Sequence, residues 1–111
     1  MTINEFQQDV LRTESGSSHK YPRILHGMMG LCGEAGEAMD ILKKTMYQHH
    51  PLDKEHFALE LGDVAYYLAL AADALGYDLE TLLRMNVKKR QARYPDGFDS
   101  ERSINREAGD I

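Results

Sequence analysis

Hydrophobic residues recur at helical spacing along most of the chain, and no segment alternates with the period of two that marks a half-buried strand. Thr2 and Glu5 form a capping box, which predicts a first helix over residues 3 to 14. Tyr21-Pro22 then opens a second, long helix that ends near His49-His50-Pro51. Glu14–Ser18, between these helices, has the composition of a loop.

Two further helices follow from the same spacing. Asp53 is placed to cap a third helix and Gly76 to terminate it. The apolar residues of this helix form a predicted packing seam of Phe57, Leu61, Val64, Leu68, Ala71 and Leu75. Asp78 caps a fourth helix that stops before Arg93, because proline and glycine follow. The pattern therefore predicts an all-α fold, a compact bundle of about four helices.

The length of 111 residues suits one domain, which we place over residues 1–98, followed by a polar tail over residues 99–111. We expect this tail to be mobile unless a partner or ligand orders it. A chain of this size buries only about 60 to 65% of its unfolded surface, which is marginal for four helices alone. We therefore expect the bundle to oligomerise through helix packing.

Composition excludes several classes of protein. The net charge of −5 disfavours binding to a nucleic acid polymer. The longest uncharged stretches, residues 24–33 and 64–72, span 10 and 9 residues, about half the length of a membrane-spanning helix. A single cysteine, Cys32, excludes an internal disulfide, and no targeting signal is recognisable at the start. We expect a soluble cytoplasmic protein.

Glycine recurs every three residues in the second helix, at positions 27, 30, 33 and 36. Each glycine costs about 1 kcal/mol relative to alanine inside a helix, so the stripe needs a compensating reason. Close approach of another helix backbone or of a ligand would supply it, and of the two we favour helix packing.

Two pairs of carboxylates carry the chemistry. Glu34 and Glu37 share one face of an apolar helix, and Glu60 and Asp63 repeat the spacing on the next helix. Glu60 lies about 40° round its helix from Val64, so it should point inward. Four inward carboxylates need a cation to stay ionised, and oxygen donors without a histidine favour Mg²⁺ or Mn²⁺. One such pair alone is usually a solvated face, but two pairs on adjacent apolar helices favour a site.

Basic residues concentrate towards the other end of the chain. Residues 34–80 hold ten acidic and three basic residues, whereas residues 84–106 hold seven basic and three acidic ones. Asn86, Lys89 and Arg93 lie on one face of the fourth helix, at a spacing that suits a polyphosphate. For Lys88 and Arg90, a solvated helix end that complements the helix dipole is an equal alternative.

Other chemically versatile residues have simpler interpretations. We expect His49, His50 and His56 to lie in a solvated turn rather than a metal cluster, and Cys32 to be a small core residue. Four methionines are expected in the core: Met28, Met29, Met39 and Met46. Tyr94 and Phe98 adjoin the basic residues and are candidates for stacking on a base, although packing is the favoured reading.

These motifs resemble the MazG-like nucleotide pyrophosphohydrolase family, within the all-α NTP pyrophosphatase superfamily. The resemblance covers roughly residues 24 to 106. It rests on the E-x-x-E and E-x-x-D pairs with 22 residues between Glu37 and Glu60, and on segments 30–37, 86–90 and 93–98. It implies an all-α homodimer or homotetramer in which Mg²⁺ supports hydrolysis of a nucleoside triphosphate to the monophosphate and pyrophosphate.

The resemblance also implies roles for individual residues. The metal ligands are Glu34, Glu37, Glu60 and Asp63. Asn86, Lys89, Arg93 and Tyr94 are the predicted contacts to the substrate. A divalent ion would lower the pKa of a water that Glu34 or Glu37 orients as catalytic base, for attack at the α-phosphorus. The alternatives are a non-catalytic helical oligomer that binds nucleotides, as a sensor or regulator, and a plain protein-interaction bundle.

Overall fold

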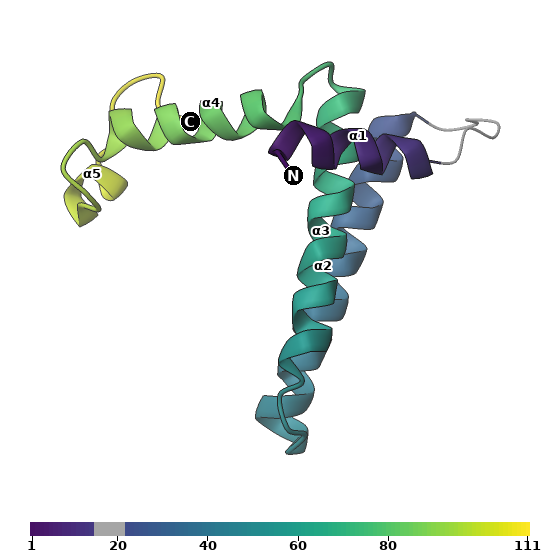
Figure 1. Cartoon of the computed structure of the whole chain (residues 1–111). Helices are drawn as coiled ribbons and strands as arrows, with labels where there is room; N and C mark the ends of the chain where they lie inside the picture. Colours follow the sequence, from purple (N-terminus) through teal and green to yellow (C-terminus); the bar gives the residue numbers. More distant parts are fainter. Residues whose placement is uncertain (15–21) are drawn as a thin grey trace. The chain divides into compact units, whose positions relative to one another are not determined.

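The computed structural model describes residues 1–14 and 22–111, and its regular secondary structure there is helical (Figure 1). The helices are α1 (Ile3–Thr13), α2 (Arg23–Gln48), α3 (Lys54–Ala74), α4 (Leu79–Arg93) and α5 (Ser100–Ile104). The all-α prediction is confirmed. Residues 15–18 of the predicted loop, and Tyr21, lie outside the described ranges. The chain divides into two compact units, Met1–Leu79 and Glu80–Ile111, and the assignment of one domain to residues 1–98 stays a prediction.

Helix ends follow the residues that predicted them. Thr2 and Glu5 form the capping box, with the Thr2 N–H donating to Glu5 Oε2 over 2.9 Å and the Glu5 N–H donating to Thr2 Oγ1 over 3.1 Å. Asp53 Oδ1 accepts a hydrogen bond from the N–H of His56 at the start of α3. Gly76 adopts a left-handed backbone with φ of +86°, which ends the turn after α3. α4 ends at Arg93, one residue later than predicted.

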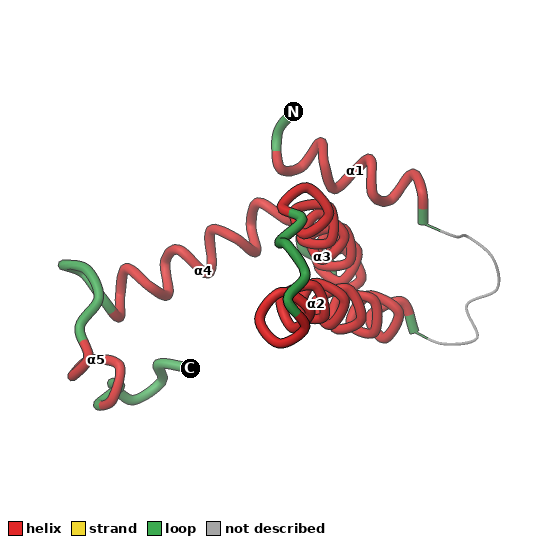
Figure 2. The backbone as a smooth tube through the Cα atoms, turned by 90° about the horizontal axis from the view of Figure 1, so that it is seen from below, coloured by secondary structure: helices red, strands yellow, loops and turns green. Residues whose placement is uncertain are grey.

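α2 and α3 lie side by side along most of their length (Figures 1 and 2). Two glycines of the stripe allow this approach. A Cβ atom at Gly27 would lie 3.0 Å from the Cβ of Ala71, and one at Gly30 would overlap the ring of Tyr67. The packing interpretation is therefore confirmed for Gly27 and Gly30.

α1 packs against α3 through a buried amide that the hydrophobic pattern did not reveal. The Gln7 side chain donates to the carbonyls of Ala69 and Tyr77 over 3.1 and 3.2 Å, and it accepts the N–H of Leu79 over 2.8 Å. All of its polar atoms are thus paired, as burial of an amide requires. The buried hydrophobic residues of the described chain are Val10, Ala38, Ala69, Leu70, Ala71, Ala72 and Leu79.

The packing seam predicted for α3 is only partly correct. Leu61 and Leu75 are 50% and 61% exposed, whereas four consecutive residues, Ala69–Ala72, are buried. Both α1 and α2 contact α3, and cover from two sides buries more than one stripe of a helix. Arg23 strengthens this end of the unit, with ion pairs of 2.7 Å to Glu14 and 2.8 Å to Asp73.

The expectation of buried sulfur side chains on α2 is wrong. Cys32 is exposed. The methionines Met28, Met29, Met39 and Met46 are 45%, 66%, 63% and 68% exposed. The physical reason is that α2 packs mainly against α3, which leaves its other faces open within one chain. None of the helices described is both long enough and apolar enough to cross a membrane.

The tail contains more structure than its polar composition predicted. Asp99 caps the five-residue helix α5 by accepting the N–H groups of Glu101 and Arg102. Beyond α5, the chain turns at Gly109, where φ is +87°. The second unit therefore consists of α4 from its second residue onward, α5 and the segments that follow each of these helices.

Candidate functional site

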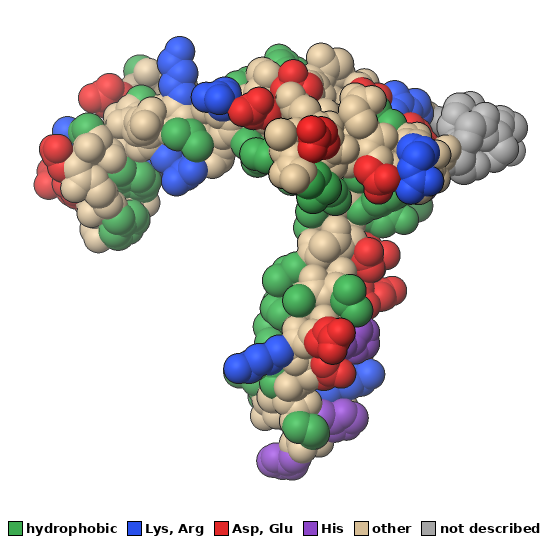
Figure 3. All heavy atoms as spheres, in the orientation of Figure 1, with side chains coloured by type: hydrophobic (Ala, Val, Ile, Leu, Met, Phe, Trp, Pro, Cys, Tyr) green, Lys and Arg blue, Asp and Glu red, His purple; other side chains and the backbone are tan. Residues whose placement is uncertain are grey.

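Three carboxylates from two helices meet in the first unit. Glu34 and Glu37 project from α2 and Glu60 from α3, and one oxygen of each lies within 4.8 Å of the others. The three-residue spacing on α2 brings its two carboxylates to one face, and the side-by-side packing of α3 adds the third. Acidic and histidine side chains gather along one side of the α2–α3 pair (Figure 3).

Glu60 is the most enclosed of the three. Its side chain is only 12% exposed, which confirms the prediction that it points inward. Oε1 lies 3.2 Å from Nε2 of His56. Oε2 is buried and has no hydrogen-bond partner among the described residues. A buried carboxylate oxygen without a donor is costly, and a cation is the ligand that would satisfy it.

The carboxylates perturb one another. The pKa of Glu34 lies above its ordinary value, first because its carboxyl interacts with the neighbouring carboxyl of Glu60, then because of desolvation and repulsion from Glu37 and Asp63. A raised pKa is the response expected when neighbouring carboxylates repel one another and lose hydration. A divalent cation would neutralise this repulsion, so the donor set fits a metal ion.

Asp63 is the predicted ligand that the structure leaves outside this cluster. It is exposed and does not lie within the group of three. Its charge still acts locally, because it contributes to the raised pKa values of Glu34 and Tyr67. The structure therefore brings together three of the four predicted ligands, with the fourth within electrostatic reach.

A cavity of about 390 Å³ adjoins the acidic cluster. Its walls are Gly33, Gly36, Glu37, Asp40, Ile41, Lys44, His56 and Glu60. A Cβ atom at Gly33 or Gly36 would meet nothing within 4 Å. The glycine stripe therefore divides into two residues that pack against α3 and two that border open space beside the carboxylates.

His56 is the residue of this site that the sequence interpretation missed. It lies in the first turn of α3 rather than in a solvated turn, and it contacts Glu60. His49 and His50 are exposed at the end of α2, as expected. The signal was the four-residue spacing of His56 and Glu60 after the capping residue Asp53, since residues four apart meet on a helix.

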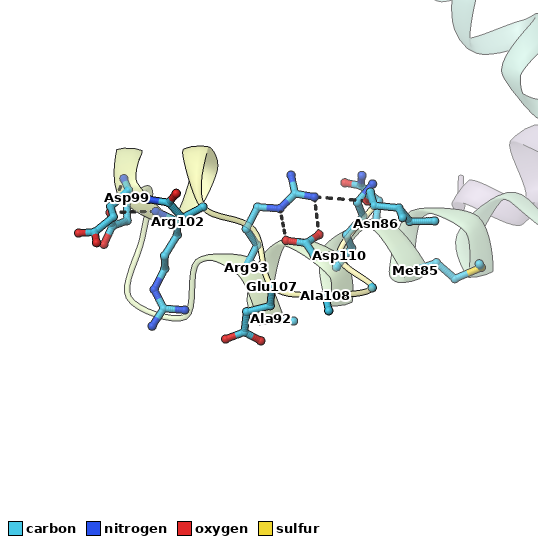
Figure 4. A pocket seen from close by; sticks show the side chains of 14 residues that line it. Met85, Asn86, Ala92, Arg93, Asp99, Arg102, Glu107, Ala108 and Asp110 are labelled. Carbon is cyan, nitrogen blue, oxygen red and sulfur yellow. Dashed lines mark hydrogen bonds and ion pairs between the residues drawn. The ribbon is translucent and has the colours of Figure 1, made fainter.

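Asn86, Lys89 and Arg93 line one pocket of about 910 Å³ within the second unit (Figure 4). The Asn86 side-chain oxygen accepts a hydrogen bond from Arg90 over 2.9 Å. Arg93 is 12% exposed and forms an ion pair with Asp110, which raises the pKa of its guanidinium. Their role in phosphate binding stays a prediction.

The two aromatic candidates contact each other. The rings of Tyr94 and Phe98 lie 5.3 Å apart, and the Arg93 guanidinium lies 5.9 Å from the Tyr94 ring. Phe98 is 76% exposed, so one ring of the pair offers a face to a ligand. Stacking on a base stays a prediction for both.

Comparison with known proteins covers most of this sequence. The family model of the MazG nucleotide pyrophosphohydrolase domain matches residues 25–98. The chain is also 34% identical over 82 residues to "Gene 37 protein" of Mycobacterium phage L5, an alignment that covers 70% of this chain and 72% of the phage protein. No solved structure matches the chain.

Proposed function

The chain belongs to the MazG nucleotide pyrophosphohydrolase family, and on this premise we propose that it hydrolyses a nucleoside or deoxynucleoside triphosphate to the monophosphate and pyrophosphate. The observation that carries the proposal is the cluster of Glu34, Glu37 and Glu60. Within it, Oε2 of Glu60 is buried and has no hydrogen-bond partner among the described residues. A plain interaction surface has no use for a carboxylate desolvated beside two others.

The proposed cofactor is Mg²⁺, with Mn²⁺ as a possible substitute, because the three residues offer only hard oxygen donors. Glu34, Glu37 and Glu60 would hold the ion, and Asp63 is the proposed fourth ligand. When bound, the ion would neutralise phosphate charge and lower the pKa of a water.

The remaining steps fall to side chains of the protein. Glu37 is exposed, which favours it over the half-buried Glu34 for orienting the attacking water. Glu37 accepts a proton from the water as the water oxygen bonds to the α-phosphorus and the bond to the pyrophosphate oxygen breaks, in line. Lys89 and Arg93 stabilise the charge on the leaving pyrophosphate, and Asn86 contacts the phosphates. Tyr94 is proposed to contact the nucleotide.

We also propose an assembly and a location. Exposed apolar side chains such as Met29 and Leu59, at 66% and 63%, support a homodimer or homotetramer formed by helix packing. The single cysteine is exposed and suits a reducing compartment, which supports the cytoplasm.

The test is pyrophosphate release from a panel of ribo- and deoxynucleoside triphosphates with Mg²⁺. We expect Glu60→Gln to lower kcat by several orders of magnitude, because the amide cannot hold a cation that stabilises the transition state. Glu55→Gln, an exposed acid in the first turn of the same helix, is the matched control and should keep parental kcat.

Two results would contradict the proposal. Near-parental turnover of Glu60→Gln would make the carboxylates structural. Nucleotide binding by the parent protein without turnover of any triphosphate would favour the non-catalytic regulator instead.

A further inference from the structure

The carboxylate of Asp110 sits on the guanidinium of Arg93 in a two-pronged ion pair. Arg93 Nε donates to Asp110 Oδ2 over 2.8 Å, and a terminal nitrogen of Arg93 donates to Oδ1 (Figure 4). Both side chains are largely enclosed, with Arg93 12% and Asp110 18% exposed. Arg93 and Asp110 both line the 910 Å³ pocket, together with Asn86 and Lys89.

More than one cation acts on this carboxylate. The pKa of Asp110 lies below its ordinary value, chiefly because of its hydrogen bonds to Arg93 and further because of the charges of Arg106 and Lys89. Three cations of the second unit therefore act on the place that the Asp110 oxygens occupy. Such a place suits an anion that carries more charge than one carboxylate.

The local backbone presents Asp110 to Arg93. Gly109, with φ of +87°, adopts a conformation that residues with a side chain rarely take. The N–H of Asp110 donates to the carbonyl of Glu107 over 3.1 Å, which closes a turn at this point. The contact is therefore held by a specific turn in the chain as well as by charge.

A two-pronged contact between guanidinium and carboxylate has the same form as one between guanidinium and phosphate. We propose that Asp110 occupies an anion site for pyrophosphate or for the phosphate chain of a nucleotide, and that it competes with these ligands for Arg93. The inference rests on the proposed function in one respect, since that function makes Arg93 a phosphate contact. Substrate then binds productively only after the turn at residues 107–110 has opened.

Titration calorimetry of the full chain with inorganic pyrophosphate, without added metal, tests this competition. Asp110→Asn removes the competing charge, and Gly109→Ala retains the charge but disfavours the turn that presents it. We expect each to bind pyrophosphate about two- to fivefold more tightly than the parent, the range in which ion pairs near a surface contribute. Asp96→Asn, which removes the same charge elsewhere in the second unit, should bind like the parent.

The double variant Arg93→Gln, Asp110→Asn should lose the gain. The proposal is overturned if Asp110→Asn binds no more tightly than Asp96→Asn, or if pyrophosphate binds none of the proteins at millimolar concentration. Because binding is measured without metal and without turnover, a protein that hydrolyses no triphosphate would refute the proposed function and leave this comparison intact. If Asp110→Asn melts at a lower temperature than the parent protein, the affinity of Gly109→Ala for pyrophosphate decides whether the proposal holds.

Discussion

His56 approaches Glu60 through one ring nitrogen, 3.2 Å from Oε1, and the other oxygen, Oε2, is buried without a hydrogen-bond partner among the described residues. A hydrogen bond to one oxygen of a ligand fixes the direction in which the other oxygen points. His56 is thus a positioning residue in the proposed site. The sequence showed His56 but not its contact with Glu60. A histidine in a solvated turn and a histidine in the first turn of a helix cannot be told apart until the start of the helix is known.

We expect His56→Ala to raise the Mg²⁺ concentration needed for half-maximal activity by about ten- to a hundredfold, the usual cost of losing a partner of a metal ligand. His56→Gln, which keeps a hydrogen-bonding group, should recover part of this loss. His50→Ala serves as the control, since His50 is exposed at the end of α2. Equal Mg²⁺ requirements for His56→Ala and His50→Ala would exclude the positioning role.

The raised pKa of Glu34 predicts how stability depends on pH. Without metal, the folded protein holds the proton of the Glu34 carboxyl more tightly than the unfolded chain does. The contribution of Glu34 to the free energy of unfolding is therefore fully present below about pH 4.3, the ordinary pKa of glutamate. This contribution is lost as the pH rises through the raised pKa. Melting temperatures measured across this range should fall with pH for the parent and less for Glu34→Gln.

Mg²⁺ should reverse this dependence above the raised pKa, because it binds the ionised carboxylates of the folded state only. The melting temperature should then increase with Mg²⁺ concentration at neutral pH, and the increase should be lost in Glu60→Gln. A parent protein whose melting temperature ignores Mg²⁺ would count against the metal site.

At the scale of elements, α2 carries two functions in one glycine stripe. Gly27 and Gly30 let α3 approach, whereas Gly33 and Gly36 border open space beside the carboxylates. Each step of three residues advances by about 300° round a helix, so the four glycines wind round α2 and do not share one face. The spacing could not show which of them meet α3, because that depends on how the two helices pack.

Two alanine substitutions should separate these roles. Gly30→Ala should destabilise the protein by about 1–3 kcal/mol, because the new Cβ overlaps the ring of Tyr67. Gly33→Ala should stabilise it by about 1 kcal/mol, because alanine favours the helix and the space around it is open. Urea denaturation of both variants measures the difference. Destabilisation of Gly33→Ala by as much as Gly30→Ala would show that Gly33 is also a packing contact.

At the scale of the whole molecule, several large apolar side chains lie exposed on the α2–α3 pair. Met29, Met39, Leu59 and Leu61 are 66%, 63%, 63% and 50% exposed. Their burial against a second copy would supply the core that one chain lacks.

Sedimentation at micromolar concentration should therefore show a dimer or tetramer. Leu59→Glu should shift the distribution towards the monomer, because a carboxylate in an apolar interface remains unpaired. Glu55→Gln, on the same helix, should leave the assembly unchanged. A parent protein that sediments as a 12.6 kDa monomer would refute the proposed assembly.

The sequence by itself determined the helices, most of their ends and the resemblance to the family, since caps, spacing and turn residues act locally. It also placed Glu60 inward, because that follows from the position of Val64 on the same helix. Only the tertiary structure decided that Gln7 joins α1 to α3, that His56 contacts Glu60, and that Asp110 forms an ion pair with Arg93. The Gln7 and Asp110 contacts join residues distant in sequence, and all three depend on polar geometry that hydrophobic periodicity does not record.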